Sequence, residues 1–243
     1  MEKICLYVLI CFLLIPSIVF AEDNELVSRN VKYYKTTYEN DFNVALLSSD
    51  KNFTIEISED EYNSIDASVD LMSSNTYQTD YKKMTASIYS SGSNYKYQVN
   101  LEWKNIPKVR SNDIIGIGYS SEFVNIVDGI SFFQNFCTSD GCKTSIKHEL
   151  INSSAGKSAV FSLPTSSLTY LNQIFSFTVV KKITEKIISQ TISGDYSHAT
   201  SKININNALK HSVDVDSGIK LYNSISSYYD SIPVTKTTWT GSW

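Results

Sequence analysis

Apolar side chains alternate with polar ones over residues 83–104. From Tyr95 to Trp103 every second residue is apolar, and the residues between them are polar or charged. A strand sends alternate side chains to opposite faces, whereas a helix would scatter these apolar residues around its axis. Residues 90–94 (S-S-G-S-N) separate two such runs with turn-forming residues. The pattern predicts a β-hairpin with one buried and one solvated face.

Shorter alternating runs with turn signals between them fill the rest of the chain, and no strand–helix–strand pattern appears. Many short strands of this kind are typical of a sandwich. The sequence therefore predicts an all-β fold, an antiparallel β-sandwich with one or two short helices. The other expected strands are 51–58, 113–119, 123–136 (bent near Asp128 and Gly129), 143–151, 159–163, 175–179, 188–198, 203–205, 213–215 and 234–243.

Two segments have helical features. Ser58 precedes Glu61 by three residues, which is a capping box and predicts a short helix over 59–65. Residues 219–229 space their apolar side chains on one helical stripe. Residues 22–50 lack clean periodicity, although 31–38 is a candidate short strand, and residues 66–80 are expected to form a polar linker. The predicted organisation is a leader over 1–21, an N-terminal arm and linker over 22–80, and a β-sandwich domain over 81–243.

The first residues have the features of a secretory signal peptide. Residues 4–20 form an apolar run broken near Pro16, and Val19 and Ala21 place small residues at a cleavage site. We expect cleavage after Ala21 and a secreted, extracellular product. No later stretch is long enough to cross a membrane as a helix, so no transmembrane segment is expected in the mature chain.

Two cysteines remain after the expected cleavage, Cys137 and Cys142, in C-T-S-D-G-C. A pair of cysteines in an exported protein is most simply a disulfide. The small loop would contribute about 2 kcal/mol and clip a hairpin tip. Free thiols, a redox pair and a metal site are the alternatives, although the spacing of the two cysteines suits neither a redox pair nor a metal site.

Composition excludes some partners. The chain has 21 Lys and Arg against 25 Asp and Glu, a net charge of −4, and no basic cluster, which argues against nucleic acid. Hydroxyl, amide and tyrosine side chains are abundant, whereas glycine and proline are few. This mixture favours exposed β-sheet.

Candidate chemistry is sparse. Arg110 and Asp113 flank a bend and are expected to form a structural ion pair, with an anion clamp as the alternative reading. The three histidines, His148, His198 and His211, lack metal-binding spacing. The sequence V-D-V-D-S-G (213–218) lacks the remaining ligands of a calcium loop and reads as an edge strand. No cofactor and no metal are expected.

Aromatic side chains suggest a candidate binding surface at Tyr196, His198, Trp239 and Trp243, because aromatic faces pack on apolar patches of sugars and peptides. Core packing is the competing interpretation of each ring. No G-x-S-x-G motif is present, and no acidic pair sits where a glycosidase needs it. We expect no catalytic residues.

Five segments carry a resemblance to a known group. They are S-E-D-E-Y (58–62), Y-K-K-M-T (81–85), W-K-N-I-P-K-V-R-S-N-D-I-I-G (103–116), Y-S-H-A-T-S (196–201) and the tryptophan-containing end (239–243). Together they resemble a family of uncharacterised exported proteins of low-GC Gram-positive bacteria. The resemblance implies export. The group has no known activity that could be carried over to this chain. The segment with Cys137 and Cys142 departs from the pattern.

Three functional classes follow, in order of preference. The first is a non-catalytic extracellular or cell-surface binding protein, whose partner is an unknown protein or a cell-envelope glycan. The second is a secreted toxin-like or membrane-active β-protein, since 94–104 is long enough for a membrane hairpin. The third is a hydrolase with an unrecognised site.

Overall fold

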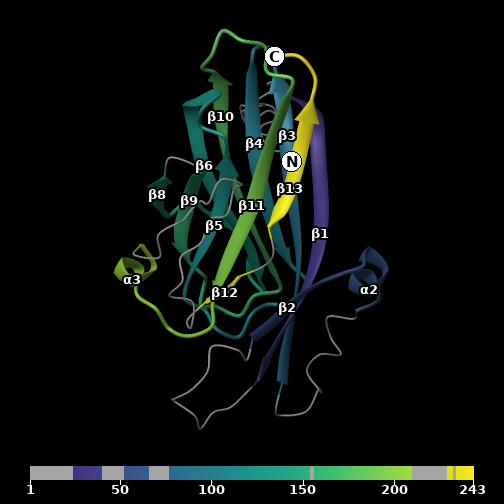
Figure 1. Ribbon diagram of the computed structural model, residues 1–243. Helices are drawn as coiled ribbons and strands as arrows, with labels where there is room; N and C mark the ends of the chain where they lie inside the picture. Colours follow the sequence, from purple (N-terminus) through teal and green to yellow (C-terminus); the bar gives the residue numbers. More distant parts are fainter. Residues whose placement is uncertain (1–23, 40–51, 66–76, 154–155, 210–228, 232–233) are drawn as a thin grey trace, which may run out of the picture.

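Two antiparallel sheets pack face to face in the computed structural model, as the alternation predicts (Figure 1). The structure describes residues 24–39, 52–65, 77–153, 156–209, 229–231 and 234–243. The expected leader, the 213–215 strand with Asp214 and Asp216, His211 and residues 219–228 of the expected helix lie outside these residues, and Tyr229, the last residue of that helix, is instead in a strand.

The larger sheet has seven strands in the order β2-β1-β3-β4-β10-β6-β7. Its predicted hairpin is β3 and β4, in which Ala86 pairs with Val99. The strands are β1 (Glu25–Glu39), β2 (Asn52–Ile57), β3 (Tyr77–Ser91), β4 (Asn94–Trp103), β6 (Val124–Thr138), β7 (Gly141–Ser145) and β10 (Tyr170–Lys181).

The smaller sheet has six strands in the order β12-β11-β5-β9-β8, and β13 also pairs with β11. In Figure 1 the yellow β13 lies along the green β11, on the side toward β1. The strands are β5 (Asn112–Tyr119), β8 (Glu149–Ser153), β9 (Gly156–Ser162), β11 (Ser189–Ala199), β12 (Tyr229–Ser231) and β13 (Thr235–Thr240).

The core lies between the sheets and is rich in aromatic rings. The apolar face of β4 is buried there, with Tyr97, Val99 and Leu101 fully inaccessible. Phe177 of β10 lies 5.9 Å from the Tyr97 ring and 5.4 Å from Tyr119 of β5. The face of β4 considered for a membrane hairpin is therefore used as sandwich core, where its burial stabilises the fold.

The N-terminal segment belongs to the sheet, so the expected irregular arm is wrong over 25–39. β1 pairs with β3 along its whole length, and the expected boundary at residue 81 falls inside β3. The candidate strand at 31–38 lies within β1 and buries Tyr34 in the core, but polar inward side chains hide the first part of the strand. Ser28 Oγ lies 2.6 Å from Thr237 Oγ1, and the Asn30 amide donates to the Lys236 carbonyl at 2.6 Å.

Two short helices flank the sandwich. α2 (Glu59–Ser64) begins as expected at Ser58, whose Oγ accepts from the Glu61 backbone N–H at 3.1 Å. α3 (Ile205–Leu209) replaces the strand expected at 203–205. Asn204 caps it by accepting from the Asn207 N–H at 2.9 Å. The apolar residues Ile205 and Leu209 then pack on the outer side of the smaller sheet.

The expected strand at 143–151 is divided between the two sheets. Its first part is β7, which pairs with β6, and its last part is β8, which pairs with β9. The chain therefore changes sheet between residues 145 and 149.

Gly194 marks the closest approach of β11 to the larger sheet. A Cβ at this position would lie 2.9 Å from Met84 Cε and 2.9 Å from Val99 Cγ2. We expect Gly194→Ala to lower the free energy of unfolding by about 1–3 kcal/mol, because the core is overpacked. Urea denaturation measures this loss. The loss should be smaller in a Val99→Ala background, and an equal loss in both backgrounds would contradict the packing explanation.

Candidate functional site

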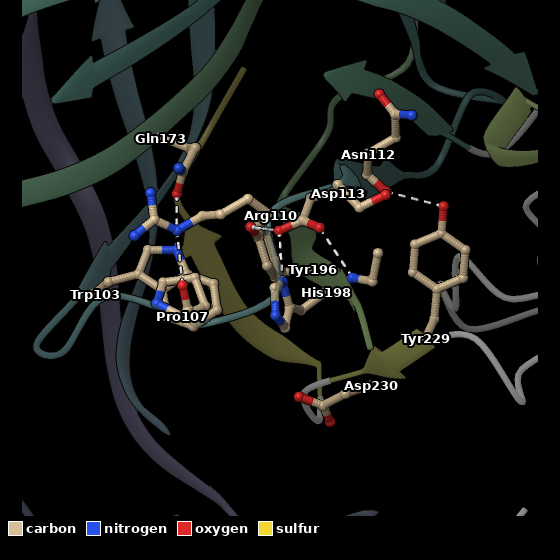
Figure 2. A network of polar contacts seen from close by, with 12 residues as sticks. Trp103, Pro107, Arg110, Asn112, Asp113, Gln173, Tyr196, His198, Tyr229 and Asp230 are labelled. Carbon is tan, nitrogen blue, oxygen red and sulfur yellow. Dashed lines mark hydrogen bonds and ion pairs between the residues drawn. The ribbon is translucent and has the colours of Figure 1, made fainter. Parts of the chain in front are cut away.

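The most polar part of the interior is centred on the carboxylate of Asp113 (Figure 2). The register that pairs Ile114 with Ser197 brings Asp113 of β5 beside the end of β11. Asp113 Oδ2 accepts from the Tyr196 hydroxyl at 2.5 Å and from His198 Nδ1 at 2.8 Å. Its Oδ1 accepts from the Ala199 backbone N–H at 2.9 Å. These donors stabilise a carboxylate that has no exposed surface.

Burial fixes the protonation state of the tyrosine in this group. Desolvation raises the pKa of Tyr196 well above its usual value, and the negative charge of Asp113 raises it further. The phenol therefore keeps its proton and acts as a donor to Asp113.

Trp103 connects the Asp113 network to the larger sheet. Its ring meets the His198 ring edge-on, with 5.0 Å between centroids. Its Nε1 donates to Gln173 Oε1 at 3.2 Å. The Gln173 amide donates to Gln134 Oε1 at 3.4 Å, and Gln134 donates to the Ser162 carbonyl at 3.1 Å. The polar groups therefore form a continuous link from β4 through β10 and β6 to β9.

A second polar cluster lies next to the first and holds a buried ion pair. Lys82 Nζ of β3 is 2.7 Å from Asp230 Oδ2 of β12, and their side chains are 0% and 3% exposed. Lys82 also donates to Thr36 Oγ1 at 3.3 Å, and Thr54 Oγ1 donates to Asp230 Oδ1 at 2.6 Å. The hydroxyl oxygens of Thr36 and Thr54 are in turn 2.9 Å apart. The four side chains form a closed ring of hydrogen bonds.

The two clusters are neighbours in space. Asp230 pairs with His198 in the register of β12 and β11, and the Lys82 ammonium lies 4.8 Å from the centroid of the Trp103 ring. Burial would raise the pKa of Asp230, but the charge and hydrogen bond of Lys82 outweigh it, so the pKa is lowered. The lowered pKa favours the ionised carboxylate.

These interior groups are out of reach of an external substrate. Asp113, Tyr196 and His198 are at most 2% exposed, and Asp230 is 5% exposed. These buried groups can therefore stabilise the contact between the two sheets or react with one another. A ligand from solvent does not reach them in this structure.

Arg110 and Asp113 do not form the expected ion pair. The Arg110 guanidinium instead donates to the carbonyls of Pro107 at 2.7 Å, Pro164 at 2.8 Å and Ser166 at 2.9 Å. It joins the bend at 107–110 to the loop at 164–166. The two side chains are close in sequence, but Asp113 has entered the strand and its carboxylate is taken by donors from β11.

The expected aromatic binding surface is also corrected. Tyr196 and His198 are interior, and Trp239 is 8% exposed and packs 5.0 Å from the Tyr95 ring. Trp243 lies 4.5 Å from Tyr95, and its Nε1 donates to the Ser93 carbonyl. The rings occur at alternate positions because that face is turned toward the core.

The disulfide between Cys137 and Cys142 is present and joins β6 to β7. His148 is half-buried, with its ring 5.4 Å from the Phe132 ring and its Nδ1 2.8 Å from the Ile146 carbonyl. In the described ranges no group of three His, Cys, Asp or Glu side chains could hold a metal ion. No helix among the described residues is long and apolar enough to cross a membrane.

The accessible candidate is on the outer face of the larger sheet, over β6 and β10. We call this surface the outer strip. It consists of four cross-strand pairs, in which apolar or disulfide-flanked pairs alternate with amide or hydroxyl pairs. They are Cys137–Tyr170, Asn135–Asn172, Phe133–Ile174 and Ser131–Ser176.

Amide hydrogen bonds organise the outer strip across neighbouring strands. The Thr144 hydroxyl donates to Asn135 Oδ1 at 2.8 Å, and the Asn135 amide donates to Asn172 Oδ1 at 3.3 Å. The Asn172 amide then donates to Asn100 Oδ1. Phe133 and Tyr170 remain 40% and 38% exposed on either side of this amide row. The side chains are held in place, yet two apolar anchors are free to meet a partner.

Sequence reasoning missed both the ion pair and the outer strip. Lys82 is in phase with Met84 and Ala86 on the inward face of β3, and a lysine in such a position signals a buried charge. Asp230 follows residues that carry no strand pattern. The outer strip depends on the pairing of β6 with β10, which are far apart in the chain.

Comparison with known proteins gives only distant likenesses. No family model and no curated protein matches the chain. One similar solved structure is the collagen-binding domain of the Erysipelothrix rhusiopathiae surface protein RspB, at 9% identity and a TM-score of 0.31. The match covers 68% of this chain and 66% of that domain, just under two thirds of its length. Another, designated BspA_C_WT, has 6% identity and a TM-score of 0.33 and covers 87% and 84%. Superpositions this loose transfer neither a site nor an activity.

Asp195 provides a pH-dependent test of the interior. Its side chain is 4% exposed, and its Oδ1 has no hydrogen-bond partner in the described structure. Burial raises its pKa from 3.8 to about 7. The folded state therefore holds this proton more tightly than the unfolded state, and stability falls as pH rises from about 4 to about 7.

We expect Asp195→Asn to stabilise the protein at pH 8 by on the order of 2–4 kcal/mol and to have little effect below pH 4, where both side chains are neutral. Urea denaturation at both pH values measures the difference from wild type. The exposed Asp140→Asn serves as the control. A stabilisation that is the same at both pH values would contradict a charge-based cause.

Proposed function

We propose that this protein is an exported, non-catalytic binding protein, and that its outer strip docks an extended polypeptide segment of an extracellular or cell-surface partner. The observation that carries the proposal is the regular alternation of apolar and amide pairs along β6 and β10. Phe133 and Tyr170 are exposed anchors, and the half-buried Ser131 and Asn135 offer hydrogen-bonding groups between them, whereas Asn172 and Ser176 are buried and support the surface from below.

The spacing of the outer strip favours a peptide. Along each strand, one pair follows the next after two residues, which is a distance of about 6.6–6.8 Å. Apolar pairs and polar pairs alternate, so pairs of the same kind recur every four residues. An extended peptide repeats its side chains on one face at the same interval. An apolar residue of the partner would meet Phe133 while its neighbours on the same face lie near Asn135 and Ser131.

The charge of the outer strip favours an uncharged segment. None of the eight residues in its four pairs carries a charge, whereas β4 and β3 beside it bear Lys96, Glu102 and Lys83. Binding would then rest on aromatic burial and amide hydrogen bonds, which are the contacts that dominate many protein interfaces.

Export is supported by three features. The expected leader ends at Ala21, the Cys137–Cys142 disulfide suits an oxidising compartment, and five segments resemble exported proteins of low-GC Gram-positive bacteria. An extracellular location gives a binding surface of this size access to host or cell-envelope partners.

A peptide-display selection tests the proposal. Wild-type protein is used to select binders from a library of unstructured random peptides, and the Kd of the best peptide is measured. We expect Phe133→Ala or Tyr170→Ala to raise the Kd about 5–30-fold, because truncating an exposed aromatic anchor costs about 1–2 kcal/mol.

Phe123→Ala is the matched control, because Phe123 is 38% exposed but lies on the turn before β6. It should leave the Kd unchanged. Purified peptidoglycan is tested in parallel. Binding to peptidoglycan with no selected peptide, or equal losses for Phe123→Ala and Phe133→Ala, would contradict peptide docking on the outer strip.

A further inference from the structure

The Lys82–Asp230 pair brings an amine and a carboxyl group into contact where water is excluded. The nitrogen and Oδ2 are 2.7 Å apart, and the two side chains are essentially inaccessible. The carboxyl carbon lies one bond beyond Oδ2, so the amine is close to the separation of about 3–3.5 Å that a near-attack arrangement requires.

Asp230 is ionised at rest, because the charge and hydrogen bond of Lys82 lower its pKa, yet the ion pair lies where water is excluded. Each ion has lost its hydration, and Lys82 is covered by the Trp103 ring at 4.8 Å from its centroid. Transfer of one proton along the 2.7 Å contact, from the ammonium to the carboxylate, gives a neutral amine beside a neutral acid. A desolvated lysine in this form is a nucleophile.

We propose that Lys82 and Asp230 join covalently, through an amide bond between Lys82 Nζ and Asp230 Cγ. The N–C bond forms and the Cγ–Oδ2 bond breaks. The ammonium gives up two protons, the departing oxygen takes both, and one water molecule leaves. The reaction is a condensation, so no oxidant, reductant or other reactant is needed.

Neighbouring side chains are placed to assist this step. Thr54 donates to Asp230 Oδ1 at 2.6 Å, which stabilises negative charge on that oxygen when the nitrogen adds to the carbon. Thr36 accepts from Lys82 at 3.3 Å and keeps the amine beside its target. Both threonines act as positioning residues, linked by their own contact at 2.9 Å.

The fold itself supplies the driving force for the condensation. Groups held in one geometry react with effective concentrations of about 10⁵–10⁸ M, and the buried site gives little room to the water that would reverse the reaction. The two residues are separated by 148 positions in the chain, so the bond would tie β3 of the larger sheet to β12 near the C-terminal end. A link of this kind would slow unfolding, which suits an exported protein that meets proteases.

Peptide mapping of the purified full chain tests the proposal. The protein is reduced, denatured and digested with a protease that cleaves after lysine, and the products are identified by mass spectrometry. We expect a joined pair of peptides containing Lys82 and Asp230, lighter than their sum by the mass of one water molecule, with no cleavage after Lys82. Separate, unmodified Lys82 and Asp230 peptides from folded wild-type protein would overturn the proposal.

The exposed Lys32–Glu56 pair is an internal control. Its nitrogen and oxygen are 2.5 Å apart, but the side chains are 28% and 49% exposed. Contact alone should not join them, because their charges are hydrated. A joined Lys32–Glu56 peptide in the same digest would show that dehydration occurs during handling, and it would count against the proposal.

Variants separate the chemistry from the fold. Asp230→Asn should still give the joined peptide, now with loss of one ammonia, whereas Lys82→Arg should give none. Circular dichroism confirms that each variant is folded before it is digested. A joined peptide at this position in Lys82→Arg would overturn the assignment, and the wild-type digest decides the question even if both variants fail to fold.

Discussion

The structure depends on charge that is buried and fully partnered between the two sheets. Asp113 has no exposed surface, and three donors from β11 satisfy its carboxylate. Losing any one donor would leave an uncompensated polar group in the interior, which is far more costly than the net worth of one hydrogen bond. The hydrogen bonds of this carboxylate therefore favour one register of β11 against β5, together with apolar packing.

The same constraint extends to the edge of the sandwich. Lys82 and Asp230 connect β3 with β12, and Trp103 lies between this pair and His198. Aromatic rings also pack around these polar groups, because Phe161 lies 6.3 Å from the Tyr196 ring and 4.5 Å from the Phe132 ring. The interior polar groups contact the protein's own side chains, and the binding surface proposed above lies on the outer face of the larger sheet.

Alternation predicts much of the fold. The β3–β4 hairpin, the Ser58 cap and the disulfide all follow from local signals, because each depends on residues close together in sequence. Only the 31–38 part of β1 has a strand signal, since Asn30 and Ser28 face β13 and break the apolar alternation before it.

The sites were less predictable than the fold because they depend on contacts between segments that are far apart in the sequence. His198 and Tyr196 share a face with apolar residues, which a single strand cannot distinguish from an exposed aromatic surface; only the opposing sheet decides. The Arg110–Asp113 pairing failed because the donors that occupy Asp113 lie more than eighty residues away. Lys82 gave the one usable signal of a buried polar site, because this charged residue is in phase with the buried Met84 and Ala86 of β3.

The stability of Asp113→Ala tests most directly whether the interior network holds the sandwich together. Urea denaturation should show a loss of about 3–5 kcal/mol, because His198 and Tyr196 lose the carboxylate that pairs with them inside the core. A variant that unfolds with a free energy within about 0.5 kcal/mol of wild type, the range of an ordinary surface substitution, would contradict this account.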